Sequence, residues 1–214
     1  MNSMPNLFDR LIFRPDQLEA LRTLYTRYFL PHMPPPELYH GRATIAVWSE
    51  DRPQSWAPGQ GLDRGHGNDA MLLDQPRLDP LWEEHFGDLL PYMSSHAIIT
   101  CMPPGHHMAA HVDRPHRPNA IYFPISGCSD LCRSEYYDLP VSTLTTIAQA
   151  THQKLEAIAT YSINTHAYLT NVHEWHGVWN DSKLVRTAFG WNMRDHTLSY
   201  SQHRAILERL GYIG

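Results

Sequence analysis

The second half of this chain consists of short runs of β-forming residues separated by turn residues, and this pattern restricts the possible folds more than any other feature of the sequence. From residue 95 onward, such runs cover 96–102, 120–125, 155–163, 166–170, 177–179 and 185–192. Short strands at even spacing favour a closed barrel or two packed antiparallel sheets. Polar turns at 164–165 and 180–183 lead us to expect two hairpins, each made of the runs on either side of its turn.

The first half of the sequence predicts helices. Asp16 and Glu19 suggest a capping box that begins an amphipathic helix over 15–30. A second helix is expected over 78–90, and a third over 200–210 at the other end of the chain. Helices before and after a set of short strands indicate a mainly β protein with flanking helices, of the α+β class.

These elements together predict a double-stranded β-helix, the barrel of jelly-roll and cupin-like proteins, buttressed by N-terminal helices. We expect a single domain over 1–214, with a helical N-terminal part over about 1–92, a barrel core over about 93–195 and a C-terminal helix over about 199–211. The sequence shows no internal repeat and no linker that would divide it.

Three further segments have predicted roles. Residues 44–48 form a β-type run and are expected as a strand. The polar, Gly-rich passage over 50–68 has no periodicity and is expected as a long loop, and 129–154 is expected as an insertion. We expect the loop and the insertion to cover the mouth of the barrel.

Composition excludes several classes of protein. Apolar residues make up 42% and charged residues 18%, a balance typical of a globular protein and not of a disordered one. A formal net charge of −5 argues against nucleic-acid and anionic-membrane partners. No apolar run reaches the roughly eighteen residues of a membrane span, and no signal peptide is evident at the N-terminus. We therefore expect a cytoplasmic protein.

Histidine is the commonest metal ligand in proteins, and the 15 histidines of this chain gather in 96–116 and 166–176. His111 and Asp113 are two residues apart, so on an extended chain their side chains point to the same face. Two ligands at this spacing on a barrel wall can share one metal ion, with Val112 turned outward. A third ligand from a remote strand, His176 or the neighbouring His173, would complete a facial triad of two histidines and one carboxylate.

Arg186 is the only charged residue in the apolar run 185–191. A guanidinium inside an apolar strand is costly to bury unless an anion pairs with it. A carboxylate is such an anion, because guanidinium can hold it with two parallel hydrogen bonds.

The order of these residues resembles the 2-oxoglutarate/Fe(II)-dependent oxygenase superfamily: His-x-Asp, a distal histidine about sixty residues later, and an arginine about ten residues beyond. Within it, the run His176-Gly-Val-Trp-Asn180 followed by Arg186 is similar to the aspartyl/asparaginyl β-hydroxylase group, and this favours His176 over His173 as third ligand. The resemblance covers about 95–192.

The resemblance implies an enzyme, a dioxygenase in which His111, Asp113 and His176 hold Fe(II) and Arg186 binds the distal carboxylate of the cosubstrate 2-oxoglutarate. With O2, such an enzyme hydroxylates an unactivated C–H bond and decarboxylates 2-oxoglutarate to succinate. The expected substrate is an amino acid, either a free small molecule or a residue in a peptide.

Two positions depart from the family patterns. Animal aspartyl β-hydroxylases have glycine in place of the acidic ligand, whereas Asp113 is present here. Many members of the superfamily carry a serine two residues after the arginine, where this chain has Ala188. We expect the hydroxyl of Tyr122 to assist Arg186 in its place.

Other polar residues near the triad have weaker predicted roles. Arg114 and Arg117 are candidates for binding a substrate carboxylate, and solvated loop positions explain them equally well. His173 is a further candidate for substrate binding, and we expect it either beside the metal ligands or at a strand end at the mouth of the cavity. His106 and His107 are expected in the loop that leads into the barrel. The alternative function is a non-oxidative cupin-like metal-binding barrel, either a zinc hydrolase or a small-ligand binder. A hydrolase would have no need of a buried arginine ten residues after its third ligand.

Overall fold

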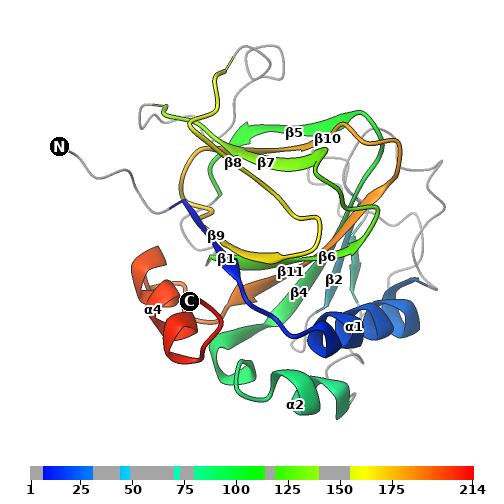
Figure 1. The fold of residues 1–214 in the computed structure, drawn as a ribbon, viewed down its shortest axis with the longest axis vertical. Helices are drawn as coiled ribbons and strands as arrows, with labels where there is room; N and C mark the ends of the chain where they lie inside the picture. The colour runs from blue at the N-terminus through cyan, green and yellow to red at the C-terminus, as the bar shows by residue number, and fades with distance from the viewer. Residues whose placement is uncertain (1–6, 31–43, 49–69, 73–79, 114–118, 140–154) are drawn as a thin grey trace.

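Two packed β-sheets form the body of the protein, and helices cover the outer side of the larger sheet (Figure 1). The computed structural model describes residues 7–30, 44–48, 70–72, 80–113, 119–139 and 155–214. Mainly β structure, two curled sheets and flanking helices confirm the prediction of a jelly-roll or cupin-like fold. None of the helices in these ranges is long and apolar enough to cross a membrane.

The large sheet has seven strands in the order β1-β9-β6-β11-β4-β2-β3. All its pairs are antiparallel except β2 with β3. In that order the strands are Phe8–Leu11, Ala167–Thr170, Ala120–Ser126, Arg186–Met193, Met93–Met102, Thr44–Trp48 and Ala70–Leu72.

The small sheet has four antiparallel strands in the order β5-β10-β7-β8. These strands are His106–His111, His176–Asn180, Cys132–Tyr136 and Ala159–Ser162. It lies opposite the large sheet, on the side away from the helices (Figure 1).

The helices pack on the outer face of the large sheet (Figure 1). They are α1 (Pro15–Leu24), α2 (Pro80–Phe86) and α4 (Tyr200–Arg209). A π-helical turn over Tyr25–Phe29 continues α1, and a 3₁₀ turn over Leu90–Tyr92 follows α2. Their apolar faces share one core with β6 and β11, in which the rings of Trp82 and Trp191 lie 4.9 Å apart. Both tryptophans are 1% exposed, so this core fixes the large sheet firmly against the helices.

A second, smaller cluster fills the space between the two sheets. Its buried members come from both sheets, from the segment before β1 and from the residue after β8: Leu7, Tyr136, Tyr161, Ile163 and Ala188. Tyr122 and Tyr168 pack against it. This tyrosine-rich interior is the space into which the inward residues of the barrel strands project.

The predicted hairpins are wrong, although most of the predicted strands exist. β8 pairs with β7 in the small sheet, whereas β9 pairs with β1 and β6 in the large sheet. Likewise β10 belongs to the small sheet and β11 to the large one. The turns at 164–165 and 180–183 therefore carry the chain from one sheet to the other instead of folding it back on itself.

Three expected elements also need correction. The first helix begins after Arg14, whose N–H donates to Gln17 Oε1 at 3.0 Å, so Asp16 and Glu19 do not form its capping box. The helical part over 1–92 also contributes β1, β2 and β3. Part of the expected insertion, Cys132–Tyr136, is β7 in the middle of the small sheet. Residues 50–68 and 140–154 lie outside the described ranges.

Candidate metal centre

The structure brings His111, Asp113 and His176 together. His111 ends β5 and His176 begins β10, and the two are direct cross-strand partners with ring centroids 4.3 Å apart. Asp113 follows β5 by two residues, and its Oδ1 lies 3.8 Å from His111 Nε2. One donor atom from each of the three residues lies within 4.8 Å of the others. Among the described residues this is the one such group of metal-ligating side chains.

A β-bulge gives His111 its orientation. The register between β5 and β10 shifts, so Met108 pairs with Val178 but His111 pairs with His176, and two residues of β5 oppose Gly177 alone. An extra residue in one strand changes which face the following side chains occupy. Ala110, within the bulge, and Val112, beyond it, pack into a separate cluster, so Val112 turns away from the site.

The backbone holds both imidazole rings in the tautomer that a metal requires. His111 Nδ1 lies 2.8 Å from the carbonyl oxygen of Ala109, and His176 Nδ1 lies 2.9 Å from that of Glu174. A carbonyl oxygen only accepts hydrogen bonds, so each Nδ1 carries a proton, and in the neutral ring Nε2 then keeps its lone pair. Such a bond to the second ring nitrogen is a regular feature of metal-binding histidines.

Burial and donor type fit a divalent transition metal. His176 is 7% exposed, and the side chains of His111 and Asp113 are 16% and 13% exposed. Two neutral imidazoles and one carboxylate form the donor set of mononuclear non-haem iron(II), and three protein ligands leave coordination positions for small molecules.

Arg186 is buried in the same interior. It is 4% exposed, and its Nε has no hydrogen-bond partner in the described part of the chain. It begins β11, two residues before Ala188, which belongs to the cluster between the sheets, so both side chains take the inward face. Burial raises the pKa of the Tyr161 phenol, and the nearby positive charge of Arg186 opposes that rise. A buried guanidinium without a described carboxylate partner is a strong candidate for anion binding.

Two tyrosine hydroxyls share the interior with Arg186. Tyr122, the predicted assistant, packs against the cluster that contains Tyr161 and Ala188. Tyr161 is a second candidate that the sequence did not single out; its hydroxyl lies 2.8 Å from Thr170 Oγ1. Tyr161 was not identified from the sequence because its short strand was assigned to the wrong hairpin. The sheet to which the strand belongs determines which residues Tyr161 faces.

The remaining candidates are not among the three grouped metal-ligating residues or lie outside the described residues. Arg114 and Arg117 fall in the undescribed segment 114–118. His173 lies in the turn before β10, where its N–H donates to Asn171 Oδ1 at 3.2 Å. His106 and His107 belong to β5, which corrects their assignment to a loop.

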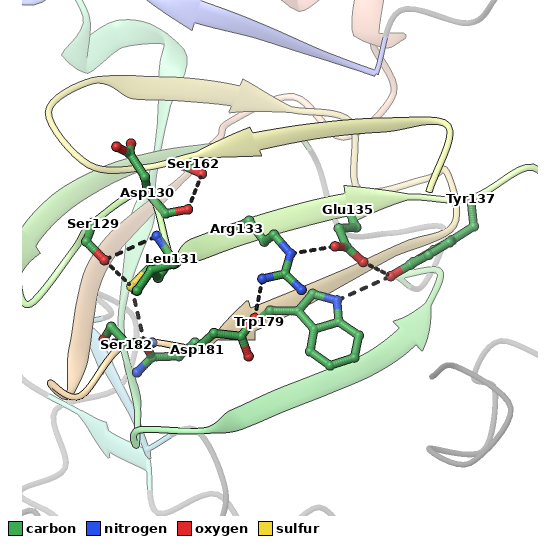
Figure 2. Close-up of polar contacts among 12 residues, drawn as sticks. Ser129, Asp130, Leu131, Arg133, Glu135, Tyr137, Ser162, Trp179, Asp181 and Ser182 are labelled. Atoms are coloured by element: carbon green, nitrogen blue, oxygen red, sulfur yellow. Dashed lines mark hydrogen bonds and ion pairs between the residues drawn. The ribbon is translucent and has the colours of Figure 1, made fainter. Parts of the chain in front are cut away.

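The outer face of the small sheet carries a separate polar network (Figure 2). Arg133 forms ion pairs with Glu135 and Asp181, and its guanidinium lies 5.2 Å from the centre of the Trp179 ring. Burial would raise the pKa of Glu135, but hydrogen bonding from Tyr137 and the Arg133 charge outweigh it and lower the pKa. Trp179 thus faces away from the triad, and the network holds β7 against β10.

No protein-family model matches the sequence, and no curated protein matches it. Among solved structures, the chain is similar to a prolyl-4-hydroxylase from Pseudomonas putida, with 15% identity, a TM-score of 0.44, and coverage of 88% of this chain and 93% of that one. It is similar to an oxidoreductase of the 2OG-Fe(II) oxygenase family from Burkholderia pseudomallei, with 16% identity, a TM-score of 0.43, and coverage of 85% and 79%. A cupin domain from Bordetella pertussis Tohama I has 13% identity, a TM-score of 0.30, and coverage of 47% and 81%.

Proposed function

We propose that this chain is a non-haem iron(II) dioxygenase that uses 2-oxoglutarate as its cosubstrate. One observation carries the proposal: a group of two histidines and a carboxylate lies in the same barrel as a buried arginine. The His176 ring lies 6.0 Å from that of Tyr136, and Tyr136 belongs to the cluster that also contains Ala188 of the Arg186 strand. A metal and a second anchoring charge in one interior suit a ligand with a chelating end and an anionic end.

Different residues would bind the chelating end and the anionic end of this ligand. His111 and His176, fixed through Nδ1, would present Nε2 to the iron, and Asp113 would supply the negative charge. Arg186 would hold the distal carboxylate of 2-oxoglutarate, with Tyr122 or Tyr161 donating a further hydrogen bond. When bound, the iron(II) would supply O2 activation coupled to decarboxylation of 2-oxoglutarate to succinate. The tyrosines and Ala188 would exclude water from this space.

The proposed reaction is hydroxylation of an unactivated C–H bond in an amino acid, free or within a peptide. The run His176-Gly-Val-Trp-Asn180 followed by Arg186, similar to that of aspartyl/asparaginyl β-hydroxylases, supports this substrate class. Asp113 favours hydroxylation over halogenation, because a carboxylate in that position leaves no site for a halide.

Anaerobic titration tests the proposal. Addition of Fe(II) and 2-oxoglutarate to the protein should produce the weak visible charge-transfer band of the chelated complex. His176→Ala should abolish the band and lower the bound iron, whereas His173→Ala, a control three residues away, should leave the metal content unchanged. Absence of the band in the wild-type protein, or unchanged metal content in His176→Ala, would refute the proposal.

A hydrolytic zinc site is the competing outcome. Such a site would use the same three side chains around a metal-bound water, and it would release no succinate from 2-oxoglutarate, because zinc has no redox chemistry. Release of succinate, screened against a panel of free amino acids and short peptides, distinguishes the two reactions and identifies the substrate.

A further inference from the structure

Asn180, the last residue of β10, is completely buried and makes an unusually large number of hydrogen bonds. Its Nδ2 donates to the carbonyl oxygens of Met102 at 2.8 Å, Pro103 at 3.1 Å and Leu184 at 2.8 Å, so two N–H bonds are shared among three acceptors. Its Oδ1 accepts from Ser182 Oγ at 2.7 Å, Ser182 N at 3.2 Å and Cys132 Sγ at 3.3 Å.

The partners of Asn180 belong to both sheets. Asn180 itself pairs with Cys132 and His106 in the small sheet, and its carbonyl accepts from Gly105 N at 2.7 Å. Met102, by contrast, ends β4 in the large sheet. One side chain therefore connects the two sheets. It does so at the end of the barrel where the chain passes from one sheet to the other, from β4 to β5 and from β10 to β11.

These bonds fix the backbone around Arg186. Met102 is the cross-strand partner of Arg186, and Leu184 precedes Arg186 by two residues. Arg186 is the first residue of β11, and pairing with β6 begins only at Thr187, with a register shift directly after it. The position of Arg186 thus depends on the turn that Asn180 holds, while the triad residue His176 lies on the same strand as Asn180.

We propose that Asn180 is a positioning residue that sets the separation between the metal centre and Arg186, and that it thereby selects the chain length of the 2-oxo dicarboxylate. This inference rests on the proposed function. A ligand held at both ends fits only one spacing, and in a closed site one methylene more or less changes affinity by roughly tenfold or more. Loosening the connection between the sheets would relax this selection without touching either end of the ligand.

Equilibrium binding to the full chain tests the inference without turnover. With Mn(II) as a metal that does not undergo the reaction, calorimetry measures the affinities for oxaloacetate, 2-oxoglutarate and 2-oxoadipate, which contain four, five and six carbons. The wild type should prefer the five-carbon acid by about tenfold or more. Asn180→Ala should reduce this preference to about threefold or less and leave the Mn(II) affinity within about threefold.

Asn119→Ala is the matched control. Asn119 is also completely buried and bonds to His203 Nδ1 at 3.0 Å, on the helix side of the large sheet. Its loss should lower stability but preserve the chain-length preference. If Asn180→Ala does not fold, Ser182→Ala serves, because Ser182 Oγ bonds both Asn180 Oδ1 and Leu184 O, at 2.7 and 3.1 Å. It should weaken the preference to a smaller extent.

The outcomes separate this inference from the proposed function. Wild-type protein that binds none of the three acids in the presence of metal refutes the proposed function itself. Folded variants at Asn180 or Ser182 that keep the full wild-type preference refute only the positioning role. An equal loss of preference in Asn119→Ala would also refute it, since the effect would then follow stability alone.

Discussion

Among single residues, Arg186 is a charged side chain that is buried in the described part of the chain. A charge that is 4% exposed and whose Nε lacks a hydrogen-bond partner costs stability unless a ligand pairs with it. The ligand-free protein therefore carries an energetic cost that anion binding would relieve. Replacement of Arg186 should therefore weaken anion binding without lowering the stability of the fold, unlike replacement of a residue that only stabilises the fold.

We expect Arg186→Met to lower the affinity for 2-oxoglutarate by about 2–5 kcal/mol, because the variant loses the charge that pairs with the distal carboxylate. The free energy of unfolding of the ligand-free protein should stay the same or rise, because methionine leaves no buried charge. Calorimetry and urea unfolding measure the two effects. Arg133→Met is the control: its ion pairs lie on the outer face of the small sheet, so binding should not change. A large loss of stability in Arg186→Met would contradict the anion-binding role.

A second prediction concerns His203, which is 1% exposed between α4 and the large sheet. Its Nε2 donates to Asp195 O at 2.9 Å, and burial lowers its pKa below the ordinary 6.5. The unfolded chain therefore binds a proton more readily, so this residue should reduce the free energy of unfolding as the pH falls below 6.5. Urea unfolding across this range should show a smaller pH dependence in His203→Gln than in the wild type, and an equal pH dependence would contradict this prediction.

At the scale of elements, two turns that contain glycine allow the cost of backbone strain to be distinguished from the cost of a steric clash. Gly127, after β6, has φ +62°, and a Cβ there would lie 2.0 Å from Val185 O, directly before Arg186. Gly105, between β4 and β5, has φ +70° and nothing within 4 Å of such a Cβ. Gly105→Ala should cost about 1–2 kcal/mol from strain alone. Gly127→Ala should cost several kcal/mol and also weaken 2-oxoglutarate binding, as thermal unfolding and calorimetry would measure. Equal costs at both positions would contradict the structure.

The strands also show which features a sequence can predict. The β-type run over 44–48 coincides with β2, because its β-branched and aromatic residues favour a strand. β7 was missed, although Cys132, Ser134 and Tyr136 are buried and the charged Arg133 and Glu135 alternate with them, a period of two that is visible in the sequence. Sheet membership was not predictable, since the turns at 164–165 and 180–183 join different sheets and only packing at long range decides this.

The metal-ligating residues likewise include features that the sequence predicts and features that it does not. The spacing of His111 and Asp113 and the position of His176 pointed to three residues that the structure groups together. Arg186 is buried, and its charge lies near Tyr161 of the cluster between the sheets. The β5 bulge that orients His111, and the hydroxyl of Tyr161 near Arg186, depend on cross-strand register and were not predictable. Local spacing indicates which residues belong together, and the register determines how they face each other.

At the scale of the whole molecule, metal binding should stabilise the fold, because the three donors come from two neighbouring strands and the segment after one of them. A metal at 100 times its Kd adds about 2.7 kcal/mol to the free energy of unfolding. For a chain of this size, this corresponds to a rise in Tm of roughly 5–10 °C. Thermal unfolding with Fe(II) under anaerobic conditions, before and after a chelator, measures it, and His111→Ala should abolish the rise.

Thermal unfolding also reports 2-oxoglutarate binding when 2-oxoglutarate is added with and without the metal. If 2-oxoglutarate chelates the metal with one end and contacts Arg186 with the other, it should raise Tm further only when metal is present, and the additional rise should disappear in Arg186→Met. Binding at Arg186 alone would instead give a rise in the metal-free protein. Since the triad lies on β5 and β10 and Arg186 on β11, a ligand that needs both would join the small sheet to the large one. An additional rise that requires both groups would therefore show that the two sheets contribute to a single site.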